Sequence, residues 1–321
     1  MTETLPPEVQ QVFDRFVTTE FTTVDRRGQP ITWPLTPYYR RGDPCIAVTT
    51  GLGYPKKAND ARANPRVALL FSDPTGCGMA DAPQVLVQGT ADVDDRDLDA
   101  NRERYRRELV EKLPSTRGQL PPRFLERLFD WYFTRVYLHV RPERVYVWPD
   151  GDAALEPKLF DAHMEEVRSG HDEEPDAPHA GTEGGAVSWD GRLDELGARY
   201  PSAVVSLVAP DGFPFSVRLP ITPDREARCV RLGGAPLGVP WQPGLACLTA
   251  HDHGPDFMWQ RNFQVRGDLV EEDGRWAVIP HKLVGGMELP PGSLISRIRS
   301  NLGGIRRYRR TAKRELAERR R

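Results

Sequence analysis

The sequence predicts a mainly β protein, made of two small antiparallel β-barrels with flanking helices. The chain has 321 residues, which is longer than one compact domain usually needs. Short strand-like runs alternate with turns that contain Gly and Pro, and few long helical patterns interrupt them. Landmarks of the first half also return in the second half. Together these observations favour a duplicated barrel over a βαβ sheet.

The repeat is supported by its spacing. Four landmarks recur in the same order, two at an offset of 184 residues and two at 178, so one gap of six residues aligns all of them. Any two β-rich segments share some alternation, so chance similarity is the alternative to duplication. The four pairs are Gly28/Gly212, Cys45/Cys229, Pro65/Pro243 and Gly89/Gly267.

Strands are expected where β-branched and apolar residues run between turn residues. Hairpin turns are expected at 25–28 and 211–214, because glycine readily adopts positive φ. The expected strands are 45–50, 64–71, 85–92 and 144–148 in the first copy, and 227–232, 242–249 and 263–270 in the second.

Helices are expected at the margins of the first copy. A charged helix is predicted over 94–112, and a strongly apolar one over 124–133, after two prolines. An amphipathic helix opens the chain, since apolar residues recur there at helical spacing. Its apolar face consists of Val9, Val12, Phe13, Phe16 and Val17.

Composition changes then divide the chain. We expect a first barrel domain at 1–150, an acidic linker rich in Gly and Pro at 151–190, a degenerate second barrel at 191–290 and a basic helix or tail at 291–321. The apolar stripe of that tail is Leu294, Ile295, Ile298, Leu302 and Ile305. Such a tail either packs on the barrel or binds an anionic surface such as a membrane.

Bulk properties exclude several classes of protein. The net charge of −2 gives no general bias toward nucleic acid or membranes, and no apolar run is long enough to span a bilayer. The N-terminus lacks the pattern of a signal peptide, so a cytoplasmic protein is expected.

The four cysteines form no CxxC pair, which favours reduced thiols. His163, His171 and His179 are eight residues apart, a poor spacing for one metal ion.

The loop after residue 50 is the main candidate for a binding site. Two hydroxyls (Thr49, Thr50), two glycines and two lysines (Lys56, Lys57) meet there at the start of a short helix. Unpaired N–H groups, the helix dipole and closely approaching glycines suit a bound anion. The alternative is a surface turn with solvated lysines. The spacing matches neither a Walker loop nor a Rossmann fingerprint, and the second copy lacks the Thr pair and the lysines.

Residues 20–148 resemble the pyridoxamine 5'-phosphate oxidase-like superfamily of FMN-binding split barrels, especially its flavin/deazaflavin oxidoreductase branch. The resemblance rests on a strand that ends in Thr, a lysine-bearing loop, a helix that ends Asn-Pro-Arg-Val, and a later strand with a central glycine. In this chain the corresponding residues are Thr49, Thr50, Lys56, Lys57, Asn59, 64–67 and 87–89. The second copy matches only as a degenerate barrel.

The resemblance implies a split barrel that normally dimerises, with FMN or a deazaflavin (coenzyme F-420) at the interface. Two fused copies would then form an intramolecular pseudo-dimer with one cofactor per chain. Thr49, Thr50 and Lys56 or Lys57 would hold the phosphate. The residues implied beside the ring system are Trp33, Pro34, Leu35, Thr36 and Gln88, with Trp259 and Arg261 from the second copy as the opposite wall. Asn59 of the motif is implied as a further cofactor-binding residue. Trp259 and Phe257 are alternatively ordinary interface packing.

The function expected from this resemblance is an oxidoreductase that transfers hydride to or from a small organic molecule. Its catalytic residues are unknown, no metal is expected, and the partner is a small-molecule substrate. One alternative is a non-catalytic protein that stores or senses flavin or haem, and another is a structural protein without a ligand. No nucleophile motif supports hydrolysis.

Overall fold

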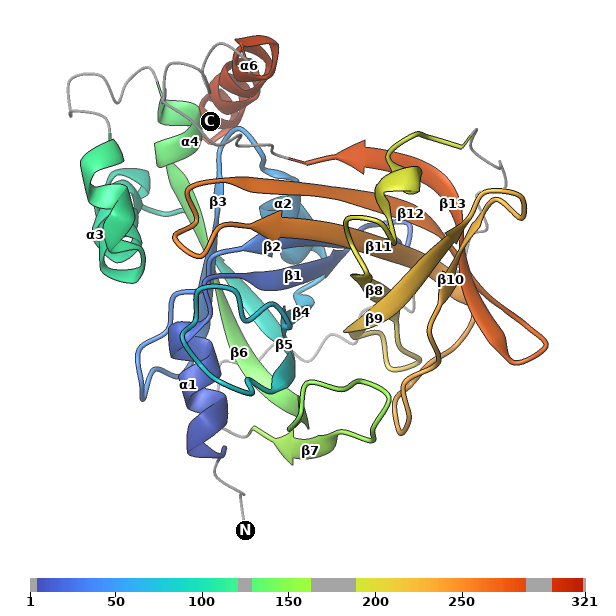
Figure 1. Cartoon of the computed structure of the whole chain (residues 1–321). Helices are drawn as coiled ribbons and strands as arrows, with labels where there is room; N and C mark the ends of the chain where they lie inside the picture. The colour runs from blue at the N-terminus through green and yellow to red at the C-terminus, as the bar shows by residue number, and fades with distance from the viewer. Residues whose placement is uncertain (1–4, 121–128, 163–188, 287–301, 320–321) are drawn as a thin grey trace.

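The computed structural model describes residues 5–120, 129–162, 189–286 and 302–319. The protein is mainly β with few helices, which confirms the predicted class. A seven-stranded sheet forms the first half and a closed barrel of six strands forms the second (Figure 1). None of the described helices is long and apolar enough to cross a membrane.

The first half carries most of the helices. Its sheet has the order β2-β1-β4-β5-β6-β3, and β7 pairs with β6. The charged helix α3 begins later than predicted because strand β5 continues to Asp94, and the Asp97 side chain then caps the helix by accepting from the N–H groups of Asp99 and Ala100. The elements are α1 Pro7–Arg15, β1 Thr19–Val24, β2 Pro30–Leu35, β3 Ile46–Gly51, α2 Lys56–Ala63, β4 Arg66–Phe71, β5 Gln84–Asp94, α3 Leu98–Lys112, η1 Pro114–Gln119, α4 Asp130–Phe133, β6 Arg135–Trp148 and β7 Lys158–Asp161.

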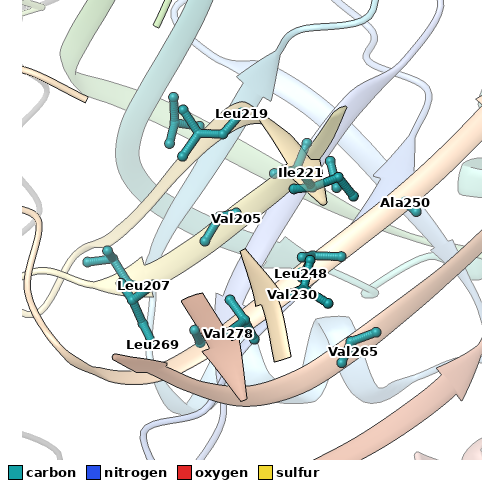
Figure 2. Close-up of a cluster of buried hydrophobic side chains, with 14 of the residues drawn as sticks. Val205, Leu207, Leu219, Ile221, Val230, Leu248, Ala250, Val265, Leu269 and Val278 are labelled. Carbon is teal, nitrogen blue, oxygen red and sulfur yellow. The ribbon is translucent and has the colours of Figure 1, made fainter. Parts of the chain in front are cut away.

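The second half, expected to be a degenerate barrel, is the one that closes. Alternate residues of its strands point inward and fill the barrel with aliphatic side chains, among them Val205, Leu248, Val265 and Val278 (Figure 2). The elements are η3 Leu193–Glu195, β8 Ser202–Val208, β9 Pro214–Asp224, β10 Cys229–Leu232, β11 Gly244–His253, β12 Gln260–Glu272, β13 Arg275–Gly285 and, beyond the barrel, α6 Leu302–Glu318.

Some expected elements differ from the structure or lie outside the described residues. Strand β7 falls inside the predicted linker and extends the first sheet through β6. Of the apolar helix predicted over 124–133, residues 124–128 are outside the described residues and Asp130–Phe133 form α4. Leu294, Ile295 and Ile298 of the predicted tail stripe, and His163, His171 and His179, are also outside them.

The two halves have the same strand order. Strands β2, β1, β4, β5, β6 and β3 correspond in turn to β9, β8, β11, β12, β13 and β10. In each half the pairing register shifts at a glycine, Gly89 of β5 or Gly267 of β12. A Cβ atom at either glycine would collide with a carbonyl oxygen, that of Arg141 or Ile279. These two glycines are landmarks of the sequence repeat, and both are required by the same β-bulge.

Replacing Gly89 with Ala is expected to destabilise the protein by about 1–3 kcal/mol, because the bulge must move away from the added Cβ. Gly191 has open space around its Cβ position, so Gly191→Ala is the matched control, with an expected effect within about 0.5 kcal/mol. Urea denaturation followed by tryptophan fluorescence measures both. Equal midpoints for the two variants would contradict the prediction.

A ring of four buried hydroxyls joins the halves. Thr22 bonds to Thr32 (2.9 Å) and to Ser216 (2.8 Å). Ser206 bonds to Thr32 (2.7 Å) and to Ser216 (2.8 Å). All four residues are fully buried, so each hydroxyl satisfies two others. Thr22 and Ser206, like Thr32 and Ser216, are 184 positions apart, which is one of the offsets of the sequence repeat.

Next to this ring lies an interface ion cluster, which we define as Glu20, Asp73, Arg218, His251 and His253. Glu20 has no exposed surface, and its Oε1 atom lies 3.0 Å from the Arg218 guanidinium and 2.6 Å from His251 Nε2. Asp73 Oδ2 lies 3.4 Å from His253 Nε2. The first half supplies both carboxylates and the second half all the basic groups, so the cluster ties the halves together.

Candidate functional site

The candidate loop is covered by two helices. The N–H groups of Leu52 and Gly53 donate to carbonyl oxygens of Thr134 (3.2 Å) and Trp131 (2.9 Å). A Cβ at Gly51 would lie 2.8 Å from the Trp131 carbonyl oxygen, and one at Gly53 would lie 3.0 Å from Tyr308 Cβ. The loop glycines therefore allow close packing of α4 and α6. The sequence had suggested that they open the backbone to an anion, and at Leu52 and Gly53 those N–H groups are already used.

The two lysines have different environments. Lys56 Nζ pairs with Asp60 (3.0 Å) and Asp25 (3.5 Å). Lys57 Nζ instead lies over the rings of Trp33 (5.9 Å) and Tyr54 (5.8 Å). Among the described residues it has no hydrogen-bond or ion-pair partner. Burial, reinforced by the nearby charge of Arg135, lowers the pKa of Lys57 to about 8. Of the two candidates, Lys57 is the cation left without an anion.

Arg135 is a second buried cation beside the loop. It opens β6, pairs with Gly51 across the sheet and is 8% exposed. Its guanidinium lies 4.1 Å from the Tyr105 ring centroid and 4.2 Å from that of Tyr132. Its Nε, like Trp131 Nε1, is buried without a hydrogen-bond partner among the described residues. Unsatisfied buried donors are costly, so an acceptor placed next to these two groups would be stabilising.

The threonines and strand β2 flank this group. Because successive side chains of a strand alternate, Thr49 and Thr50 point to opposite faces of the sheet. The Thr50 hydroxyl donates to the Tyr54 carbonyl (2.8 Å), which fixes the turn. In β2, Trp33 faces Lys57, whereas Thr32 faces the second barrel. Pro34, Leu35 and Thr36 are half-buried and follow Trp33 along the chain.

Helix α6 packs against the outside of the loop, beside α4 (Figure 1). Tyr308 stacks on Trp131 with centroids 5.3 Å apart, and its ring also contacts that of Tyr54 in a tilted arrangement at 4.3 Å. Ala312 is buried one turn further along, and Arg319 pairs with Asp95 at the end of the helix. The described part of the basic tail, helix α6, therefore docks on the first half.

The remaining predicted site residues lie elsewhere. Asn59 is exposed and accepts from Arg62 (3.3 Å). Gln88 Nε2 donates to the Pro214 carbonyl (2.9 Å) between the two halves. Arg261 pairs with Glu195 of its own half at 2.8 Å. Trp259 packs against Gly254 of its own hairpin, and the neighbouring Phe257 packs on a cluster of the first half.

Other residues of the second barrel reach β2. Thr249 and Gln264 donate to the Thr32 carbonyl at 3.2 and 3.0 Å. Arg266 donates to Gln264 (2.8 Å), and its charge acts on Asp60 of α2. The second half therefore approaches β2 through β11 and β12, at residues other than the Trp259 and Arg261 that the sequence suggested.

Sequence reasoning missed Arg135, Trp131 and Tyr308. They come from α4, β6 and α6, far along the chain from the loop, and none belongs to a motif. Of the three, only Arg135 could have been singled out from the sequence, because it is the one charged residue in the largely apolar run 131–138.

No protein-family model matches the sequence, and no curated protein matches it. Solved structures are similar to the chain over about half of its length. General stress protein 26 from Bacillus anthracis is 16% identical, with a TM-score of 0.29, and the match covers 48% of this chain and 98% of that one.

Two further solved structures match a comparable share of the chain, with comparable TM-scores. A Clostridium acetobutylicum protein described as related to general stress protein 26, of the pyridoxinephosphate oxidase family, is 13% identical with a TM-score of 0.33, and the match covers 48% of this chain and 92% of that one. An FAD-binding protein from Mesorhizobium loti is 21% identical with a TM-score of 0.30, and the match covers 43% and 89%.

Proposed function

We propose that this chain is a flavin- or deazaflavin-dependent oxidoreductase, with one cofactor whose phosphate binds between Lys57 and Arg135. The observation that carries the proposal is a half-buried lysine and a buried arginine beside one loop, neither of which has a carboxylate partner among the described residues. A buried charge without a counter-ion is strongly unfavourable. An anionic ligand removes that cost.

The donor set fits a phosphate group. Lys57 offers an ammonium group. The first turn of α2 has no side-chain cap, so its N–H groups are not bonded by a capping side chain, and the positive end of the helix dipole lies at the same place. Trp33 and Tyr54 bring flat apolar surface next to Lys57, where a planar ring system can lie. Lys56 is left out of the site because Asp25 and Asp60 already hold it.

A bound flavin or deazaflavin supplies the hydride-transfer chemistry, and the chain supplies binding, orientation and exclusion of water. Lys57 holds the anionic end. Helix α6 shields the loop from solvent through Tyr308. Gln264 and Arg266 extend the site into the second barrel, next to the backbone of β2.

The proposal includes a fused pair of equivalent halves, of which only the first has a cofactor loop. It is supported by the matching strand order, by the bulges at Gly89 and Gly267, and by the hydroxyl ring whose members are related by the repeat. In the second half, residues 232–240 occupy the place of the loop and contain no lysine. We therefore expect one cofactor per chain.

The described histidines do not favour the haem-binding alternative. Each described histidine ring already contacts another group. His139 lies 3.6 Å from Cys45 Sγ, His251 lies 2.6 Å from Glu20 Oε1, His253 lies 3.1 Å from the Thr18 hydroxyl, and His281 lies 3.0 Å from Asp268.

The test is cofactor binding by the purified full chain. We expect titration with FMN or the deazaflavin to saturate at one equivalent per chain, with a change in the cofactor's visible absorption and fluorescence. Riboflavin, which lacks the phosphate, should bind much more weakly. A Soret band on adding haem, with no flavin binding, would establish the alternative. A chain that binds none of these compounds would overturn the proposal.

A further inference from the structure

Arg135 has no carboxylate partner within the part of the chain that the structure describes, and its surroundings keep it charged. Its Nη2 donates to the Tyr105 hydroxyl (2.6 Å), and two tyrosine rings cover the faces of its guanidinium. Burial raises the pKa values of Tyr38 and Tyr105 well above their ordinary value of 10.0, so neither becomes an anion near neutral pH. By contrast, Arg104 of α3 pairs with Glu108 at 2.8 Å. The rings of Tyr105 and Tyr132 thus lie where a carboxylate usually pairs with a buried arginine, but they do not neutralise the charge of Arg135.

Arg135 pairs with Gly51 at the start of the loop, and its charge acts on Lys57, which follows the loop on α2. Burial and then Arg135 lower the pKa of Lys57 from 10.5 to about 8, and Asp60 opposes them only weakly. The ion-pair partner of Asp60 is Lys56, so Asp60 does not serve as a counter-ion of Lys57. The titratable or charged groups around Lys57 are Tyr54 of the turn, Lys56 and Asp60 of α2, Asp25 of the β1–β2 turn, Tyr132 of α4, Arg135 of β6, Tyr308 of α6 and Arg266 of β12.

We propose that Arg135 acts together with Lys57 on the bound phosphate and makes this site selective for doubly charged phosphate monoesters. This inference rests on the proposed function and narrows it to FMN, whose terminal phosphate is a monoester. Two neighbouring cations repel each other until an anion lies between them. A dianion compensates both charges, whereas a singly charged phosphodiester compensates one.

The free site and the occupied site then differ in protonation. Above about pH 8 the free Lys57 is neutral, so binding must take up a proton. FMN affinity is therefore expected to stay level from about pH 7 to 8 and then to fall about tenfold per pH unit. At the acid end it should fall below about pH 6, where the phosphate becomes a monoanion.

Arg135→Gln gives a result that loss of structure would not produce. Affinity for FMN at pH 7 should fall about tenfold, yet the alkaline decline should move upward by about one pH unit or more, because Lys57 now keeps its proton. Arg135→Lys should restore the decline near pH 8. Selectivity for FMN over the deazaflavin, a phosphodiester, should shrink in Arg135→Gln and return in Arg135→Lys.

The same inference can be tested in the unaltered chain without any flavin. NMR of isotope-labelled lysine side chains, assigned with Lys57→Met, should give a Lys57 pKa of about 8 that rises when inorganic phosphate is added. A value near 10.5, or an alkaline decline that Arg135→Gln leaves in place, would overturn the role of Arg135. FMN binding that depends on Lys57 would still stand in that case. Absence of FMN binding by the unaltered chain would instead refute the proposed function.

Discussion

Lys57→Met is expected to weaken FMN binding about 100-fold, and Lys56→Met to change it by less than about threefold. Removing one member of a desolvated charge pair costs about 2–5 kcal/mol, and each 1.4 kcal/mol is tenfold in affinity. Lys57 is the half-buried lysine without a carboxylate partner, whereas Lys56 already pairs with Asp25 and Asp60. Fluorescence titration of FMN at pH 7 measures both variants.

The comparison is informative because the two lysines are adjacent on α2 and the substitutions are identical. Thermal melting of each variant shows whether the fold is retained. Riboflavin serves as a second ligand, and its weak binding should be the same in both variants because it has no phosphate. Equal losses of FMN affinity in the two variants, or a larger loss in Lys56→Met, would mean that the phosphate is not held at Lys57.

Glu20→Ala is expected to destabilise the chain by about 3–5 kcal/mol, since it leaves buried basic groups without their anion. Glu20 has no exposed surface, and it contacts both Arg218 and His251. Glu111→Ala is the control, because the Glu111–Arg40 pair is exposed and should contribute less than about 1 kcal/mol. Urea denaturation gives both values. Similar midpoints would show that the interface ion cluster does not hold the halves together.

The pH dependence of stability tests the same cluster. Burial opposes ionisation of Glu20, but the hydrogen bond and charge of His251, together with Arg218, outweigh it and lower its pKa below 4.5. The pKa of Asp73 is likewise lowered below 3.8. A carboxyl with a lowered folded-state pKa adds stability that is complete above its unfolded-state pKa and is lost as pH falls through the folded value. Stability should therefore decline below about pH 4.5, and less steeply in Glu20→Gln.

Local patterns in the sequence predicted the class of fold well. Alternation of apolar residues and the chemistry of Gly- and Pro-containing turns act over a few residues, so they indicate strands such as β4 and β5 directly. Gly89 and Gly267 stood out in the sequence, and in each half the bulge leaves no room for a side chain at that position. Element ends were less well predicted, as at α3, where continuing strand pairing displaced the helix start to Leu98.

The sequence by itself determined that the chain is mainly β, that its landmarks repeat, and that one loop carries two lysines. Only the tertiary structure decided which lysine lacks a partner, because that depends on Asp25 and on Arg135, which other strands bring to the loop. It also decided that the loop glycines face α4 and α6. Charge pairing and close packing are set by neighbours in space, and those neighbours lie up to about 250 residues away along the chain, as Tyr308 does from Gly53.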